Sequence, residues 1–403
     1  MVDKVSPFRP GTPASPDIFV GRLDQIEEIT RYINQSAKGR QENLFLIGDR
    51  GIGKSSLAAY LMNYAKKVNK MIGIHLFLDG TDDVNGVIKK IIEALLNEVS
   101  EEKWYDKVGN IFQKYVETIG IAGVNIKFKP PAEDLQVITD EFPTILENVL
   151  NEIKKEKDGL FIVLDDINGL TDDPKFANWC KSFVDTVGTK YVDVGFPVFL
   201  MLVGLPEKRE ALLSHNESFM RIFHVTEIDR LSNDEVNDFI TNTFNQIGYE
   251  VEDKAKSIIQ YYSSGLPTMM HEIGDSTFWF DDDQIISRDD ALKGVADAGR
   301  NIGKKYIKPA VLSGAIRSER YRSILNKLGD DLLFEFNKKQ VEEKLTEPEK
   351  QVFSDFLVRC RELGIIDFKE VRGAGEYKFV NNLYTVYFMI QASLSKEDQK
   401  TLV

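Results

Sequence analysis

The sequence predicts an α/β core built on a parallel sheet, followed by a helical domain and a C-terminal winged helix. Three patterns in this chain of 403 residues support that fold class. Short apolar runs alternate with helical periodicity over residues 18–231, helical periodicity alone continues over residues 232–305, and three helices precede a hairpin pattern within residues 316–395. Residues 1–17 contain four prolines and show little periodicity, so we expect an extended arm there.

Four apolar runs supply the strands of the expected sheet. Each run is nearly continuous, which is typical of strands that helices cover on both faces of a parallel sheet. The runs are NLFLIG (43–48), IGIHLFLD (72–79), LFIVLDD (160–166) and VFLMLVG (198–204). Between the second and third runs the chain is longer than one crossover needs. About residues 81–145 are therefore expected to form an insertion of amphipathic helices, with a short hairpin at IGIAGVNIKFKPP.

Helix and hairpin signals organise the rest of the chain. SNDEVNDFITNTFNQIG begins with Ser232, a favourable N-cap, and closes on Gly248. Further along, helices are expected at about 318–328, 337–345 and 347–363, and two alternating strands flank the glycine-rich turn of GIIDFKEVRGAGEYKFVNN. Helix, helix, helix and hairpin is the order of a winged helix.

Composition narrows the classes of function. The net charge of −13 argues against charge-driven binding of nucleic acid or an anionic membrane, although it leaves room for a local basic patch. The two cysteines, Cys180 and Cys360, are isolated, which indicates a reducing compartment and no metal knuckle. The four histidines form no zinc motif, and the sequence shows neither a signal peptide nor a membrane span. A cytoplasmic location is expected.

Residues 48–55, GDRGIGKS, fit the phosphate-binding pattern G-x-x-x-x-G-K-[ST] at every fixed position. In such a loop glycines let backbone N–H groups turn inward, Lys54 reaches the β- and γ-phosphates, and Ser55 binds Mg²⁺. The alternative is a glycine-rich turn with an exposed lysine, but the buried strand before it and the amphipathic helix after it favour a nucleotide. The residues expected to bind ATP or ADP are Gly48, Asp49, Arg50, Gly51, Ile52, Gly53, Lys54, Ser55 and Ser56.

A second motif supplies the carboxylates that Mg²⁺ and an attacking water need. The third apolar run ends in Asp165 and Asp166, at the edge of the sheet where α/β proteins bind ligands. We expect Asp165 to hold Mg²⁺, directly or through water, and Asp166 to orient or deprotonate the hydrolytic water. The alternative is that the pair simply begins a turn. Together with the phosphate loop, the pair predicts a P-loop NTPase core.

These motifs resemble those of AAA+ ATPases, in particular the branch of the origin-recognition-type replication initiators and the STAND-type signalling ATPases. The resemblance covers about residues 18–392. FVGR (19–22) stands where this family has a box beside the adenine, which implies a nucleotide contact for Val20. The two aspartates match the STAND form of the acidic strand. GLPTMMHEIG matches the STAND G-x-P element, in which the proline, here Pro267, packs near the base.

The resemblance also identifies candidates further along the chain. VFLMLVGLPE matches the sensor-1 strand, although residues 203–205, Val-Gly-Leu, stand where a polar sensor is often found. Thr268 stands about where the initiators carry a sensor-2 arginine. Arg221 follows the sensor-1 strand and is the candidate arginine finger, with a solvated surface arginine as the alternative. His271 either contacts a phosphate from the helical lid or is a packed core histidine.

What the resemblance implies is an AAA+/STAND-like ATPase that hydrolyses ATP slowly to ADP and phosphate, with Lys54, Asp166 and Arg221 in catalytic roles. Mg-ATP binding would act as a conformational or assembly switch, with homo-oligomers formed through the core. The winged helix would be a regulatory or partner-binding arm, and the alternative is an initiator-like protein that binds duplex DNA when ATP is bound. Residues 316–403 carry 15 basic and 15 acidic side chains, which favours the regulatory arm.

Overall fold

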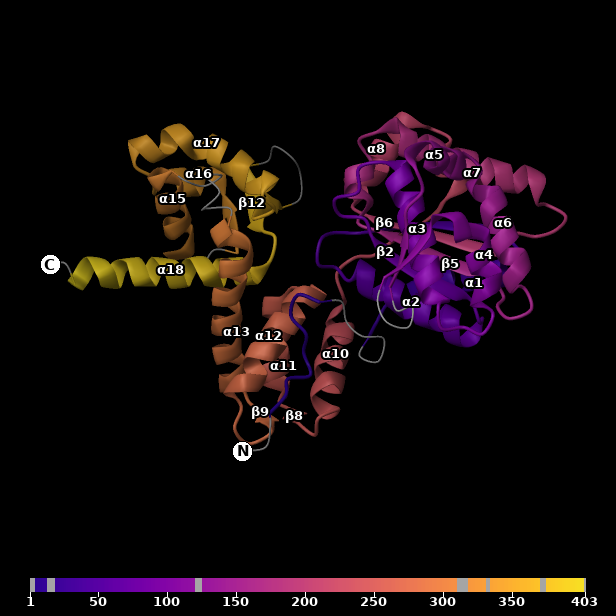
Figure 1. Cartoon of the computed structure of the whole chain (residues 1–403). Coiled ribbons are helices and arrows are strands. Elements are labelled where there is room, and N and C mark those ends of the chain that lie inside the picture. Colours follow the sequence, from indigo (N-terminus) through magenta and orange to yellow (C-terminus); the bar gives the residue numbers. More distant parts are fainter. Residues whose placement is uncertain are drawn as a thin grey trace. The chain divides into compact units, whose positions relative to one another are not determined.

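The computed structural model describes residues 4–12, 19–119, 125–309, 318–330, 334–369 and 375–401. The chain forms two compact units, whose elements are labelled in Figure 1. Pro13–Asp229 form one of them, called the core unit below. Met1–Thr12 and Arg230–Val403 together form the other, called the helical unit. The N-terminal segment thus belongs to the helical unit, although it precedes the core in sequence.

The core unit contains a parallel sheet of five strands in the order β2-β5-β6-β1-β7. Three of the strands, β1, β5 and β6, are buried along their whole length, as their continuous apolar composition predicts. The sequence does not predict β7, a short edge strand in which only Thr226 is buried. The strands are β1 (Glu42–Ile47), β2 (Ile72–Phe77), β5 (Leu160–Asp165), β6 (Val198–Gly204) and β7 (His224–Glu227).

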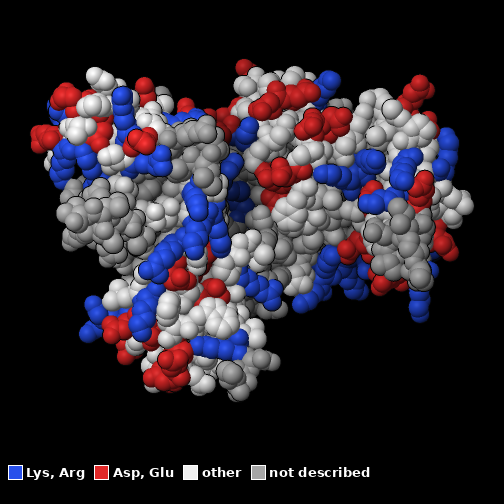
Figure 2. Space-filling model, turned by 60° about the vertical axis from the view of Figure 1, so that its left-hand side comes forward, with Lys and Arg blue, Asp and Glu red and all other residues white. Residues whose placement is uncertain are grey.

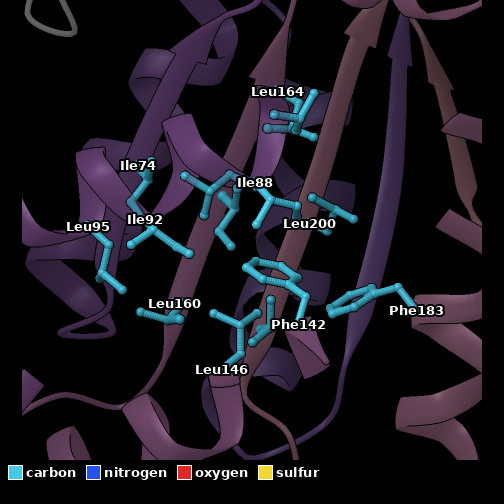
Figure 3. Packing of buried hydrophobic residues seen from close by; sticks show 14 of the residues in the cluster. Ile74, Ile88, Ile92, Leu95, Phe142, Leu146, Leu160, Leu164, Phe183 and Leu200 are labelled. Carbon is cyan, nitrogen blue, oxygen red and sulfur yellow. The ribbon is translucent and has the colours of Figure 1, made fainter. Parts of the chain in front are cut away.

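Helices of the core unit pack their apolar faces on this sheet. Figure 3 shows α3, α6 and α7 contributing side chains to one cluster over the strands: Ile88, Ile92, Leu95, Phe142, Leu146 and Phe183 lie against Ile74, Leu160, Leu164 and Leu200. The helices are α1 (Leu23–Ala37), α2 (Lys54–Val68), α3 (Val84–Glu98), α4 (Tyr105–Phe112), α5 (Ala132–Asp140), α6 (Phe142–Ile153), α7 (Pro174–Lys190), α8 (Pro206–His215) and α9 (Phe219–Ile222), with 3-10 turns η2 (Gln113–Tyr115) and η4 (Ile167–Leu170).

The long segment between β2 and β5 is part of the same core. Its antiparallel hairpin pairs β3 (Val116–Ile119) with β4 (Asn125–Phe128), so the second strand lies within the predicted segment 119–131, the first begins three residues before it, and residues 120–124 lie outside the described part. Phe128 is fully buried and meets the rings of Phe112 and Tyr115 edge to face. The hairpin therefore adds to the core of the unit.

The helical unit begins with a helical bundle, as its periodicity predicts. Ser232 forms a capping box with Glu235 at the start of the first helix, which satisfies backbone N–H groups that the helix leaves free. The helices are α10 (Asn233–Asn245), α11 (Asp253–Ser263), α12 (Pro267–Phe280) and α13 (Arg288–Ile302), and α13 continues into a π-helical turn, η5 (Gly303–Ile307). Two short strands, β8 (Glu250–Val251) and β9 (Ile285–Ile286), pair between them.

A winged helix follows in the same unit. Its sheet has the order β10-β12-β11 and is antiparallel. The sequence predicts the three helices and the hairpin but not the first strand, nor the last helix, which packs on α13 and α15 (Figure 1). The predicted wing tip, 372–375, lies mostly outside the described residues. The elements are α15 (Glu319–Asp330), β10 (Glu335–Asn337), α16 (Lys338–Glu342), α17 (Glu347–Glu362), β11 (Ile366–Phe368), β12 (Glu376–Phe379) and α18 (Asn382–Thr401).

The N-terminal segment is docked on the helical bundle. Residues 4–12 form no helix or strand, but the ring of Phe8 is 4% exposed and lies 4.9 Å from that of Phe244. The backbone N–H of Arg9 donates a hydrogen bond of 3.2 Å to Nδ1 of His271. His271 is therefore a packed core residue, the second of the two alternatives, and burial, with a smaller effect from the charge of Arg9, lowers its pKa to about 4.

No helix in the described part of the chain is long and apolar enough to cross a membrane.

Candidate nucleotide-binding site

The loop that joins β1 to α2 has the geometry of a phosphate-binding loop. Gly51 and Gly53 adopt left-handed backbone angles, with φ of 75° and 99°, that residues with a Cβ rarely adopt. At Gly48 a Cβ would lie 2.6 Å from the carbonyl oxygen of Ile228, so only glycine fits there. The loop ends at Lys54, the first residue of α2, and the helix N-terminus therefore faces the loop.

Lys54 turns its ammonium group back into this loop. Its Nζ donates hydrogen bonds to the carbonyl oxygens of Gly48, at 2.6 Å, and Asp49, at 2.8 Å. Burial lowers the pKa of Lys54, and the carboxylates of Asp165, Asp49 and Asp166 oppose that shift. The two sequence motifs, phosphate loop and acidic strand end, therefore share one electrostatic environment.

The two aspartates stand at the C-terminal edge of the sheet in different environments. Asp165, the last residue of β5, pairs in register with Val203 of β6, which pairs in turn with Leu46 of β1. Asp165 is 4% exposed, and its Oδ2 lies 2.9 Å from Nε2 of His75. Asp166 has a left-handed backbone (φ 57°), is only partly buried, and accepts a hydrogen bond from the side chain of Asn168. A buried carboxylate and a more accessible one thus stand side by side.

The FVGR segment contacts both the phosphate loop and the helix that follows it. The ring of Phe19 stacks on that of Tyr60 in α2, with centroids 5.1 Å apart. Arg22 is 6% exposed, and its Nη2 donates to the carbonyl oxygen of Ile52 at 3.3 Å. Val20, the predicted nucleotide contact, lies between Phe19 and Arg22 in the sequence and is half-buried. The role of Arg22 was missed because an arginine in a short motif gives no sign of burial.

Three other predicted positions lie apart from the loop in sequence. Val203 and Gly204 end the buried strand β6, and a Cβ at Gly204 would be 3.3 Å from Ile167 and Phe45, which leaves little room for a polar sensor there. Arg221 is exposed on the short helix α9 of the core unit. Pro267 is the first residue of α12 in the helical unit.

The donor set fits Mg²⁺ bound with a nucleotide. Ser55 stands in the first turn of α2, and Asp165 ends β5, so one hydroxyl and one carboxylate are offered. Among the described residues, no group of three or more histidine, cysteine, aspartate or glutamate side chains is placed to hold a metal alone. Mg²⁺ in proteins commonly takes one or two side-chain ligands and completes its shell with phosphates and water.

Comparisons with known proteins agree with the fold. Residues 18–179 match the family described as the AAA ATPase domain, and no curated protein matches the chain. Among solved structures, ORC2 of Aeropyrum pernix in ADPNP–ADP complexes has a TM-score of 0.54 at 13% identity, covering 93% of this chain and 96% of that one. CDC6P from Pyrobaculum aerophilum has a TM-score of 0.51 at 14% identity, covering 97% and 98%.

The chain therefore has the fold of an AAA+ ATPase, with a P-loop core, a helical bundle and a C-terminal winged helix. This confirms the fold class that the sequence predicts. At these identities the two solved structures establish the fold and leave the activity of this chain to be inferred from its own residues.

Proposed function

We propose that this chain is an AAA+/STAND-like ATPase in which Mg-ATP binding and slow hydrolysis drive a conformational or assembly switch. The observation that carries the proposal is geometric: the phosphate loop after β1 and Asp165 at the end of β5 lie at the same edge of the sheet, and Lys54 turns its ammonium group into the loop. ORC2 of Aeropyrum pernix, which has this fold, forms complexes with ADP and an ATP analogue. The intact P-loop geometry supports the same ligands here.

Each residue has a distinct role in the proposed reaction. Backbone N–H groups of the loop bind phosphate oxygens, and Lys54 exchanges its two carbonyl partners for the β- and γ-phosphates. Ser55 and Asp165 would hold Mg²⁺, which neutralises phosphate charge when bound. Asp166 orients the attacking water and accepts its proton. Arg221 of a neighbouring subunit stabilises charge on the transferred group.

The proposed slow turnover follows from the residues at the two sensor positions. The sensor-1 position is taken by Val203 and Gly204, and Val203 is fully buried. Thr268 stands in the first turn of α12, where a lid arginine would assist hydrolysis. Each lost contact to the γ-phosphate removes transition-state stabilisation, so we propose that the protein acts through which nucleotide it binds and not through a high rate of hydrolysis.

The charges of the winged helix favour a regulatory or partner-binding arm over duplex DNA. The three basic residues of α17, the helix that would enter a groove, all have acidic neighbours. Lys350 contacts Glu347 at 2.7 Å, Arg359 contacts Glu362 at 2.6 Å, and Arg361 lies 3.8 Å from Asp367. A helix that binds phosphates needs uncompensated positive charge, which this helix lacks.

The test is to compare the protein with ADP, with a non-hydrolysable ATP analogue and without nucleotide. Light scattering gives the mass in each state, small-angle X-ray scattering the dimensions, and anisotropy of a labelled duplex the DNA binding. We expect mass or dimensions to differ between ADP and the analogue, with no retention of the duplex. Identical mass and dimensions in all three states would refute the switch, and nucleotide-dependent duplex binding would support the initiator-like alternative.

A further inference from the structure

The buried aspartate of the site has a histidine partner that no motif indicated. His75 lies on β2, the edge strand next to β5, and its Nε2 is 2.9 Å from Oδ2 of Asp165. An ionised carboxylate can only accept, so the histidine nitrogen is the donor when Asp165 is charged. Both side chains are largely buried, with 15% of the His75 side chain and 5% of the Asp165 side chain exposed.

The strand register explains how the contact forms. Asp165 pairs with Phe77, and His75 pairs with Val163, so His75 reaches diagonally across two parallel strands toward the end of β5. Residues two apart in a strand point to the same face, and the rings of His75 and Phe77 accordingly stack with centroids 4.7 Å apart. The stack limits rotation of the imidazole, so the donor nitrogen is held at a fixed place beside the carboxylate.

We propose that His75 is a positioning residue for the metal site. Its Nε2–H holds Oδ2 of Asp165, which fixes the plane of the carboxylate and leaves Oδ1 for the cation. This inference rests on the proposed function, because Asp165 is taken as a ligand of nucleotide-bound Mg²⁺. Hydrogen bonds of this kind orient metal ligands, and their loss typically weakens metal affinity by about 10- to 100-fold.

A second histidine in the core unit provides a matched control. His224 on β7, at the opposite edge of the sheet, lies 3.2 Å from Oε2 of the buried Glu42. Its ring stacks on that of Tyr32, with centroids 4.1 Å apart. His224 thus repeats the combination of a strand histidine, a buried carboxylate and a ring stack, but Glu42 and His224 begin β1 and β7, at the end of the strands away from the P-loop.

The experiment measures ADP affinity by calorimetry with Mg²⁺ and with EDTA, and Mn²⁺ binding to the ADP complex by electron paramagnetic resonance. His75→Phe keeps a ring but removes the donor, whereas the side-chain amide of His75→Gln can still donate. We expect His75→Phe to weaken Mn²⁺ binding by about 10- to 100-fold with ADP affinity in EDTA unchanged, and His75→Gln to recover most of the loss. His224→Phe should leave both quantities unchanged.

Two results would overturn the inference. Metal affinity of His75→Phe equal to that of the parent protein would show that the contact does not position Asp165. Equal losses in His75→Gln and His75→Phe would show that restoring a donor does not restore metal binding, so the donor is not what positions Asp165. If His75→Phe does not fold, His75→Gln and the non-donating His75→Leu decide the same question. A parent protein that binds no metal with ADP would instead refute the proposed function itself.

Discussion

Replacing Gly274 with alanine should detach the N-terminal segment from the helical unit. Gly274 lies within α12, and a Cβ added there would overlap the ring of Phe8. In an ordinary helix the same change stabilises by up to about 1 kcal/mol, because glycine is a poor helix former. Here the ring must leave a site in which only 4% of Phe8 is exposed. The steric conflict therefore opposes the gain in helix propensity.

The size of the effect follows from the lost burial of the Phe8 ring. Removing a buried phenylalanine costs about 3–5 kcal/mol, whereas the gain in helix propensity is present in both the docked and the open state and cancels from their difference. The docked state of residues 4–12 should therefore lose about 3–5 kcal/mol relative to the open state. Since about 1.4 kcal/mol is tenfold in an equilibrium constant, opening of the segment should become at least about 100-fold more frequent.

Amide hydrogen exchange measures this opening directly, because the N–H of Arg9 is bonded to His271. Gly188→Ala is the control, since Gly188 lies within α7 and a Cβ there would meet nothing within 4 Å. In a Phe8→Ala background the ring is absent, so Gly274→Ala should stabilise the helical unit instead of destabilising it. Protection of Arg9 that is unchanged by Gly274→Ala would refute the docking argument.

Three further predictions concern single residues. Because burial keeps His271 neutral down to about pH 4, whereas an unfolded histidine protonates near 6.5, the helical unit should lose up to about 3 kcal/mol of stability as pH falls from about 6.5 to 4. Urea unfolding across that range should show the loss disappear in His271→Gln but persist in the exposed His215→Gln. Asp166→Asn should bind ATP as the parent does but release no phosphate, since an amide cannot accept the proton from water; parental turnover in a phosphate-release assay would contradict this. ATPase activity per subunit should rise with protein concentration, and it should fall about 10³-fold in Arg221→Ala. Turnover that depends neither on concentration nor on this substitution would show that Arg221 is not part of the site.

Much of the fold could be predicted because burial leaves a mark on composition. Strands β1, β5 and β6 are covered on both faces and read as continuous apolar runs. The edge strands β7 and β10 have four and three residues with polar side chains among them, too short and too mixed for periodicity to identify. The docking of Phe8 had no sequence signal, since a single aromatic in a proline-rich segment sets no pattern.

The candidate site shows the same limit. Its loop is a motif of fixed spacing and its aspartates end a continuous apolar run, and the strand register places Asp165 at the same edge of the sheet as the loop. The contact between His75 and Asp165 depends on which strands are neighbours, because 90 residues separate the two in the chain. Spacing in the sequence does not determine strand order, so contacts across the sheet emerge only from the fold.

The most direct measurement for the central claim is calorimetric titration of the parent protein and Lys54→Ala with ATP and Mg²⁺. Lys67→Ala, at the exposed far end of the same helix, is the control. The parent and Lys67→Ala should bind Mg-ATP with equal affinity, and folded Lys54→Ala should bind at least about 10-fold more weakly, because it lacks the charged donor to the phosphates. Equal affinity in all three proteins, or no binding by the parent, would contradict the assignment of this loop as an ATP site.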